Sequence, residues 1–194
     1  MNRALITYGG NAAITAIGAI SSLSTLFLMP IIGIQQGMQP IISYNHGSML
    51  KDRVNKTVLL SIIISSAFVV IVFVCLQIFP ETFMSMFLSK ESSTMQVAVT
   101  GLRYYIIMLP GLGIGFIGSA YFQSIAKSKE AIILGSLRQF ILLIPLVIIL
   151  PKLFGLKGVW LSTPVADAIT ILATTILLIR DIKTPYKQVM VQSS

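Results

Sequence analysis

The amino-acid sequence predicts an all-α membrane protein, built as a bundle of about five transmembrane helices. Of its 194 residues, 55% are hydrophobic and only 10% are charged, and the mean hydropathy is +0.90. A water-soluble domain carries roughly 25% charged residues, because its surface must face water. The apolar residues are also gathered into segments of about 20 residues or more, which is long enough for a helix to cross a bilayer. Every backbone amide in lipid needs a partner within the protein, so we expect helices although Ile and Val are abundant.

The first two spans are expected to end at residues that stop helices. The first begins in "AAITAIGAISSL" and continues through "GIQQGMQPIISYN", where Asn45 and Gly47 suit a helix C-terminus. The second contains "LLSIIISSAFVVIVFVCLQIF" and is closed by Pro80. In the same way, Pro151 is expected to close the fourth span. The five predicted spans cover residues of about 12–45, 58–79, 97–123, 131–150 and 159–179.

Prolines and glycines inside the spans predict bends or close helix contacts. In the third span, "PGLGIGFIG" joins Pro110 to a run of glycines, and Gly111 and Gly115 have the GxxxG spacing of closely packed membrane helices. A proline removes one helix hydrogen bond and can kink the helix. Close packing and a bending helix of a transporter are both compatible with this pattern. The same roles in packing or as hinges are open for Pro30, Pro145 and Pro164.

The Lys and Arg residues predict the orientation of the bundle in the membrane. Cytoplasmic connections carry the excess of these residues. One side has Lys51, Arg53, Lys56, Lys127, Lys129, Arg180, Lys183 and Lys187, and the other has Arg3, Lys90, Arg103, Lys152 and Lys157. We therefore expect a multi-pass protein of the cell membrane, with a cytoplasmic tail over residues 183–194. Five spans then place the N-terminus outside, which leads us to expect at least one preceding helix.

Two charged residues lie well inside apolar segments. Arg138 occurs in the fourth span and Asp167 in the fifth. A charge near the bilayer centre costs a few kcal/mol and usually faces a cavity or a partner. Arg138 is expected either to extend towards the cytoplasmic headgroups or to pair with Asp167. Asp167 is expected to make a structural hydrogen bond or ion pair, or to act in a proton or cation relay.

The sequence holds no pattern of an enzyme or of a metal protein. It has one Cys and one His, without a cluster of further ligands beside them. No phosphate-binding loop or nucleophile motif is found, so we expect no catalytic residue and no cofactor. The net charge is +8, but the basic residues are scattered between apolar runs, and nucleic acid is therefore not an expected partner.

Several stretches, taken in order, resemble the multidrug and toxic compound extrusion (MATE) family of efflux antiporters. They are "YGGNAAITAIGAISSL", "GIQQGMQPIISYNHG", "YFQSIAKSKEAIILGSLRQFILLIPLVIILP" and "FGLKGVWLSTPVAD". The resemblance implies a twelve-helix fold of two lobes, in which residues 1–182 correspond to about helices 8 to 12 of the C-terminal lobe. It also implies a missing N-terminal lobe as partner. The expected function is export of small organic cations or drugs across the lipid bilayer in exchange for H+ or Na+, which the sequence does not distinguish.

The resemblance also suggests which polar side chains border the central cavity. Gln35 and Gln39 share one face of the first span, and uncharged polar groups there can hydrogen-bond across helices. We interpret them, with Gln36, Tyr121 and Gln123, as candidate cavity-lining residues. Purely structural helix packing is the alternative role for the whole set.

Two other functions remain open at this stage. One is export of lipid-linked or polysaccharide compounds by a transporter of the related superfamily, which a strongly cationic cavity would favour. The other is a non-transporting membrane scaffold, which the absence of an N-terminal lobe would favour.

Overall fold

The computed structural model describes residues 2–89 and 93–184, which form helices joined by short turns, without a β-strand in these ranges. The elements in chain order are α1 (Asn2–Gly47), α2 (Lys51–Ile78), α3 (Pro80–Met84), α4 (Ser93–Tyr105), α5 (Leu109–Ser124), α6 (Ser128–Ser136), the π-helix η1 (Leu137–Leu142), α7 (Leu143–Phe154) and α8 (Leu156–Lys183). The prediction of an all-α membrane fold is confirmed.

The helices supply four or five passages of membrane length. Within the described residues, four helical segments are long and apolar enough to cross a bilayer: Gly9–Gly47, Lys51–Ile78, Ser128–Phe154 and Leu156–Lys183. A fifth passage is formed if Thr94–Tyr105 and Leu109–Ser124 count as one span, bent by 53° at the break between them. Each passage begins before its predicted span, and all but α2, which ends at Ile78, also continue beyond it. Hydropathy marks the hydrocarbon-facing part, whereas helical hydrogen bonding continues into the polar ends.

Three local breaks shape these passages. Gly10 has φ 63° and ψ −160°, a conformation open to glycine, and it separates the first turns of α1 from the rest. The bend between α4 and α5 lies just before Pro110, which occupies the first turn of α5. The π-helix η1 interrupts the fourth passage. Pro151 was expected to end that passage, but this prediction is wrong: α7 continues to Phe154 and ends at Gly155, whose φ is 57°.

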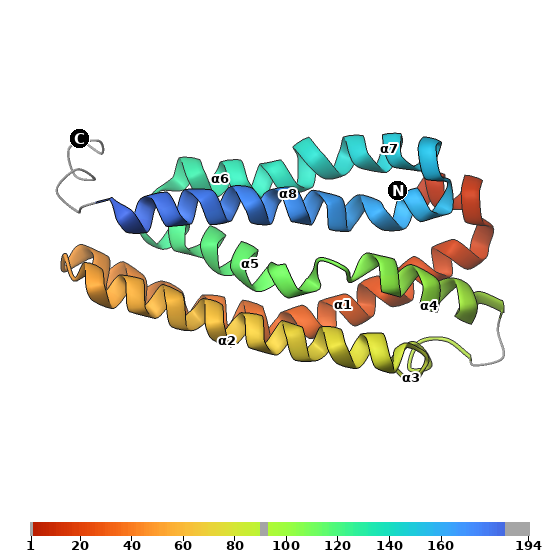
Figure 1. Ribbon diagram of the computed structural model, residues 1–194, viewed down its shortest axis with the longest axis horizontal. Helices are drawn as coiled ribbons and strands as arrows, with labels where there is room; N and C mark the ends of the chain where they lie inside the picture. Colours follow the sequence, from red (N-terminus) through yellow and green to blue (C-terminus); the bar gives the residue numbers. More distant parts are fainter. Residues whose placement is uncertain (1, 90–92, 185–194) are drawn as a thin grey trace.

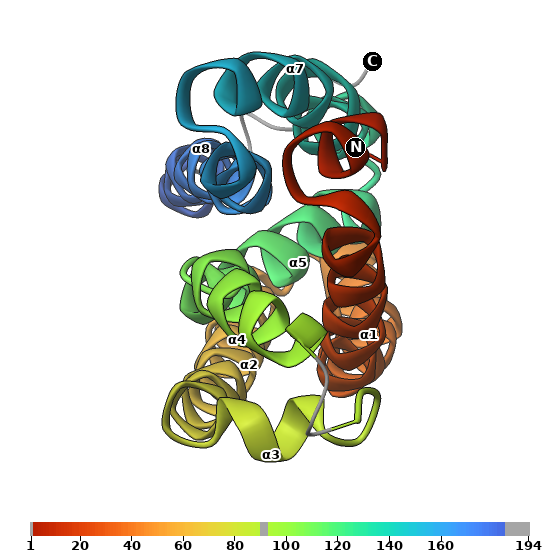
Figure 2. The ribbon, with the colours of Figure 1, turned by 90° about the vertical axis from the view of Figure 1, so that its right-hand side faces the viewer.

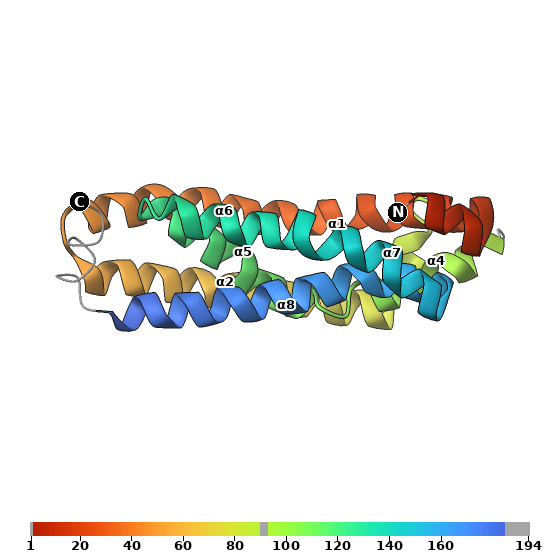
Figure 3. The same ribbon diagram turned by 90° about the horizontal axis from the view of Figure 1, so that it is seen from above.

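The helices run along one long axis, with α5 between two groups of neighbours. Figures 1 and 2 show α1 and α2 on one side of α5 and α6, α7 and α8 on the other. The view from above in Figure 3 shows α1, α2 and α8 running along this axis, with α6 and α7 following one another beside them. The buried apolar residues form two clusters along this axis, one around Trp160 and Leu102, and one around Phe122, Ile42 and Leu178.

Glycines of α5 allow its neighbours to approach closely on two sides. A Cβ at Gly111 would lie 2.7 Å from Cδ1 of Ile171 on α8, and a Cβ at Gly115 would lie 3.5 Å from Cγ1 of the same side chain. On the other side, a Cβ at Gly113 would lie 3.0 Å from the backbone nitrogen of Ser66 on α2. The GxxxG pair is thus a packing surface for α8, and the glycine between its two members serves α2.

The two ends of the bundle differ in the number of their Lys and Arg residues. The α1–α2 turn, the α5–α6 turn and the end of α8 meet at the left-hand end in Figure 1, and they carry the basic residues predicted to face the cytoplasm. Lys90 and the tail beyond residue 184, including Lys187, lie outside the described residues.

Candidate functional site

Arg138 and Asp167 meet within the bundle. Nε of Arg138 donates to Oδ1 of Asp167 at 2.5 Å, and the Asp167 side chain is 5% exposed. The guanidinium also lies over the Phe116 ring, with Cζ 5.7 Å from the ring centroid. The carboxylate and the aromatic face both favour a positive charge at this point. The sequence left several arrangements of these two charges open, and the structure contains the Arg138–Asp167 ion pair.

Both residues of this pair lie well inside helical segments that are long and apolar enough to cross a membrane. Arg138 lies ten residues after Ser128, or about 15 Å along its passage, and Asp167 lies eleven residues after Leu156, or about 17 Å along α8. The two passages are antiparallel, and the hydrocarbon core is about 30 Å thick. An unpaired charge at that depth costs about 3 kcal/mol on insertion scales, so each residue depends on the other.

A π turn carries Arg138 to its partner. Arg138 lies in η1, which precedes Pro145, and a proline displaces the carbonyl four residues earlier. That carbonyl belongs to Ile141, within the π turn, where the wider helix accommodates the proline ring. Single π turns inside α-helices are frequent at functional sites.

The ion pair lines a cavity between α5, α6, η1 and α8. The cavity volume is about 170 Å³, and its walls combine apolar, aromatic and small polar side chains. Thr174, which is fully buried, has a hydroxyl oxygen without a hydrogen-bond partner among the described residues. The lining consists of Leu112, Gly115, Phe116, Ser119, Leu134, Gly135, Arg138, Gln139, Asp167, Thr170, Ile171 and Thr174. In this arrangement the guanidinium of Arg138 neutralises the carboxylate of Asp167, so the cavity lining carries a balanced pair of charges.

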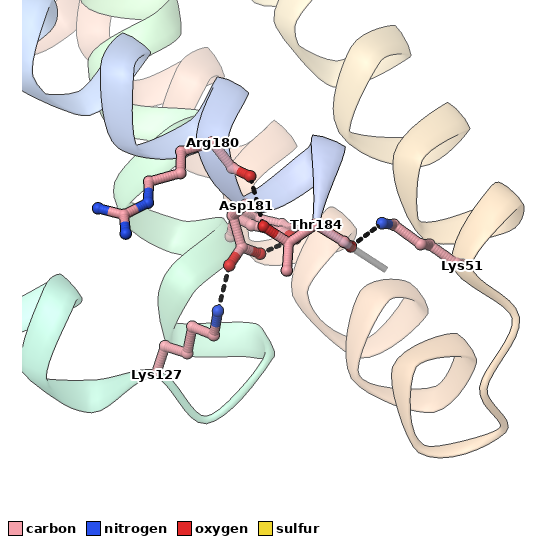
Figure 4. Close-up of polar contacts among 6 residues, drawn as sticks. Lys51, Lys127, Arg180, Asp181 and Thr184 are labelled. Atoms are coloured by element: carbon pink, nitrogen blue, oxygen red, sulfur yellow. Dashed lines mark hydrogen bonds and ion pairs between the residues drawn. The ribbon is translucent and has the colours of Figure 1, made fainter. Parts of the chain in front are cut away.

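A second polar cluster lies at the basic end of the bundle. The Tyr121 hydroxyl donates to Oδ2 of Asp181 at 2.6 Å, and the Lys127 ammonium pairs with Oδ1 of the same carboxylate. Figure 4 shows Lys127 reaching from the α5–α6 turn to Asp181 near the end of α8. Asp181 thereby joins two elements that are far apart in the sequence.

The same cluster extends to the start of α2. The Lys51 ammonium donates to the backbone carbonyl of Thr184, while the Thr184 hydroxyl donates to the carbonyl of Arg180 at 2.8 Å (Figure 4). The C-terminal turn of α8 leaves carbonyl groups without helical partners, and a lysine is a suitable donor to them. The end of α8 is thus fastened to both neighbouring turns.

The predicted cavity-lining glutamines lie apart from the Arg138–Asp167 cavity. Nε2 of Gln39 on α1 donates to Oε1 of Gln123 on α5 at 3.3 Å, an exposed contact. One turn further, the Ser43 hydroxyl donates to the carbonyl of Ser124 at 2.9 Å. Gln35 is partly exposed and Gln36 is exposed on the same helix. Within this chain these amides connect α1 to α5, and their placement beside a cavity shared with another lobe stays a prediction.

Sequence reasoning missed the residues that complete both polar sites. Asp181 follows Arg180 in "LLIRDIK", a stretch that has the pattern of a solvated helix end. The available signal for an ion pair was an acidic residue among the basic residues at this end of the chain. Phe116 and Thr174 lie in apolar runs without any distinguishing pattern. Among the described residues, no group of three or more His, Cys, Asp or Glu side chains is arranged to hold a metal ion.

Comparisons with known sequences place the chain among membrane transporters. A family model described as MatE matches residues 1–149. The chain is 28% identical to the multidrug export protein MepA of Staphylococcus saprophyticus over 176 residues, which cover 89% of this chain and 38% of MepA. It is 24% identical to the FAD transporter of Shewanella oneidensis over 168 residues, which cover 84% of this chain and 36% of that protein. The chain thus spans less than two fifths of the length of these relatives.

Comparisons with solved structures give the same fold. An outward-facing multidrug resistance MATE family transporter of the MOP superfamily matches with a TM-score of 0.87 at 20% identity, covering 96% of this chain and 42% of that chain. An inward-facing structure of such a transporter matches with a TM-score of 0.85 at 18% identity, covering 96% and 43%. The MATE multidrug transporter DinF-BH matches with a TM-score of 0.79 at 34% identity, covering 91% and 40%.

Proposed function

We propose, from the premise that this chain belongs to the MatE family of transporters, that it forms part of the C-terminal lobe of a multidrug efflux antiporter. The proposed substrates are cationic or amphipathic organic compounds, exported in exchange for H+ or Na+. The observation that carries this proposal is the Arg138–Asp167 pair beside a cavity of about 170 Å³. A charge pair held at mid-membrane depth is the usual mark of an ion or substrate pathway.

In the proposed mechanism, Asp167 is the group that responds to the coupling ion. Arg138 now neutralises its carboxylate at 2.5 Å. A proton or Na+ arriving at Asp167 competes with the guanidinium, which then turns away and changes the charge of the cavity wall. A cationic substrate competes for the same carboxylate and for the face of Phe116, so that ion and substrate exclude one another.

The proposed movement is a rocking of one lobe against the other. Residues 1–182 would move as one body, with a second lobe supplying the opposite wall of the central cavity. The TM-scores of 0.87 and 0.85 against an outward-facing and an inward-facing transporter support a lobe that keeps its internal fold in both states. Gln35, Gln36 and Gln39 are proposed to border the cavity between the lobes, with the basic end and the C-terminus in the cytoplasm.

The test is ethidium efflux from pump-deficient cells. One strain expresses this chain, and a second expresses it together with the genomic sequence immediately upstream. We expect efflux only in the second strain, and Asp167→Asn is expected to abolish it. Asp52→Asn, which removes an exposed carboxylate from the first turn of α2, is the matched control and is expected to leave efflux unchanged.

Three results would contradict parts of this proposal. Efflux from the chain alone would show that a second lobe is not required. Full efflux by Asp167→Asn would show that the Asp167 carboxylate is not needed for transport. Absence of efflux from both strains, with both proteins present in the membrane, would favour the lipid-linked or polysaccharide exporter or the non-transporting scaffold instead.

A further inference from the structure

A groove lies between α1 and the beginning of α2, at the basic end of the bundle. Its volume is about 440 Å³, and it is distinct from the Arg138–Asp167 cavity because it involves neither α5 nor α8. Arg53 and Lys56 line it from α2, and Asn45 lines it from α1. None of these three residues takes part in the polar cluster around Asp181. The basic residues of the groove are therefore not accounted for by the contacts that fasten the end of α8.

The residues of the groove are ordered by depth in the membrane. Arg53 and Lys56 lie about 3 and 8 Å along α2 from its first residue, whereas Leu60 and Ile64 lie about 14 and 20 Å along it. The side chains of Leu60 and Ile64 are 55% and 48% exposed. The groove thus has a cationic end near the membrane surface and an apolar wall that continues into the hydrocarbon region.

The cationic end has no anionic partner of its own. Among the described residues, neither Arg53 nor Lys56 makes an ion pair, and Asp52 is absent from the groove lining. Lys51 on the same turn is directed to the carbonyl of Thr184 instead. Two cations that share one groove repel each other unless an anion lies between them.

A buried amide adds a polar group to the same end. Asn45 is 7% exposed, and its Nδ2 donates to the carbonyl of Ile41 at 2.7 Å. Its Oδ1 has no hydrogen-bond partner among the described residues. A buried acceptor without a partner is costly, so this amide is an unusual polar group beside the two cations.

We propose that this groove binds one anionic phospholipid, with its phosphate between Arg53 and Lys56 and an acyl chain along Leu60 and Ile64. A phosphate accepts charge-assisted hydrogen bonds from both cations. Basic sites between membrane helices near the cytoplasmic surface are suited to anionic headgroups. A protein helix is the other conceivable occupant, but it would have to supply acidic partners for both cations at the membrane surface, where the leaflet already supplies phosphates.

The inference is tested by lipid binding to the purified full chain, which needs no transport activity. The chain in detergent is titrated with phosphatidylglycerol or phosphatidylcholine, and bound lipid is counted by native mass spectrometry. We expect preferential binding of phosphatidylglycerol. The double variant Arg53→Gln/Lys56→Gln is expected to weaken that binding about thirtyfold, since two basic residues near a membrane surface together contribute about 2 kcal/mol.

Two further variants distinguish lipid binding in this groove from general attraction of anionic lipid to a basic protein. Lys152→Gln/Lys157→Gln removes the same charge from exposed positions at the opposite end, and it should leave the phosphatidylglycerol affinity within about twofold. Thr57→Trp keeps both cations but fills the groove, and it should weaken binding as the double variant does.

Four outcomes would overturn the inference. The first is equal affinity for the two lipids, and the second is an equal loss of affinity in the Lys152→Gln/Lys157→Gln control. The third is displacement of the lipid by millimolar inorganic phosphate, which would indicate a site for a free anion. The fourth is loss of phosphatidylglycerol binding when the upstream sequence is co-expressed, which would indicate that a protein segment covers the groove.

Discussion

Each of the two ion pairs of α8 joins an aspartate of this helix to a basic residue, but the surroundings differ. Asp167 meets Arg138 well inside two segments of membrane length, whereas Asp181 meets Lys127 at the basic end of the bundle. Both carboxylates are shielded, with side chains 5% and 12% exposed. Asp167 lines a cavity, and its partner lies on a π turn, whereas Lys127 lies in the turn between α5 and α6. The pair at the end connects chain segments, and the pair in the middle has room beside it for another ion.

This difference bears on what each pair contributes. At the membrane surface, water and salt can replace either partner of the Lys127–Asp181 pair, so breaking it has a small effect. Within the hydrocarbon region nothing replaces a lost partner, so removing one member leaves an uncompensated charge. A mid-membrane pair is therefore maintained only where the second charge is always supplied, by the protein or by a transported ion.

The largest expected effect is that of Asp167→Asn on stability. The change leaves the Arg138 guanidinium without a counter-charge, and we expect a loss of about 3 kcal/mol or more. The measurement is thermal unfolding of the chain in detergent, followed by the loss of monodisperse protein. The double variant Arg138→Met/Asp167→Leu removes both charges and is expected to restore most of the stability. Equal destabilisation by the single and double variants would contradict the assignment of the pair.

The sequence predicted the passages and the mid-membrane charges because lipid imposes strict rules on both. Twenty apolar residues in a row have few alternatives to a helix, and Arg138 and Asp167 are conspicuous within them. The π turn could not be predicted, since Pro145 alone is equally compatible with a simple kink. The continuation of α7 past Pro151 was missed because a proline within the last turns of a helix is tolerated when its neighbours supply the remaining contacts.

The polar end of the bundle was harder to predict for a physical reason. Lys51, Lys127 and Asp181 lie in a connection or in the terminal turn of a helix, where any charged residue is stable in water, so their identity does not indicate a partner. Which of them meet depends on how the passages pack, and that depends on small residues such as Gly113 and Ser66. Sequence patterns indicate that such residues pack closely but not against which helix.

The next largest effect is expected for Gly113→Ala. The new Cβ would lie 3.0 Å from the backbone nitrogen and 3.1 Å from the hydroxyl oxygen of Ser66, so α2 and α5 must separate slightly. Overpacking of this kind costs about 1–3 kcal/mol. Gly37→Ala is the matched control, since nothing lies within 4 Å of its Cβ and alanine favours the helix by about 1 kcal/mol. The same thermal-unfolding measurement decides, and a Gly113→Ala protein as stable as Gly37→Ala would contradict the close approach.

A smaller effect is expected for Asp181→Asn at the basic end. The change removes the Lys127 pair but keeps an acceptor for the Tyr121 hydroxyl, and we expect a loss of about 1 kcal/mol at low salt. The loss should shrink as salt rises, because salt screens the pair that the variant lacks. Asp167→Asn should show no such salt dependence. Parallel salt titrations of both variants measure this difference, and identical salt responses would mean that the two pairs do not differ in exposure to water.

The smallest expected effect is that of the Gln39–Gln123 contact. Its distance of 3.3 Å and its exposure indicate a weak hydrogen bond, and polar pairs between membrane helices contribute about 0.6 kcal/mol on average. A double-mutant cycle of Gln39→Leu and Gln123→Leu, followed by thermal unfolding of the chain, should therefore give a coupling of about that size. A coupling near zero in the chain, combined with loss of ethidium efflux in Gln39→Leu when the upstream sequence is co-expressed, would place the amide in the cavity between lobes. A coupling well above about 1 kcal/mol would instead make Gln39 a packing residue. The glutamine face of α1 would then hold helices together, as the polar contacts at the end of α8 do, rather than line a cavity as Asp167 does.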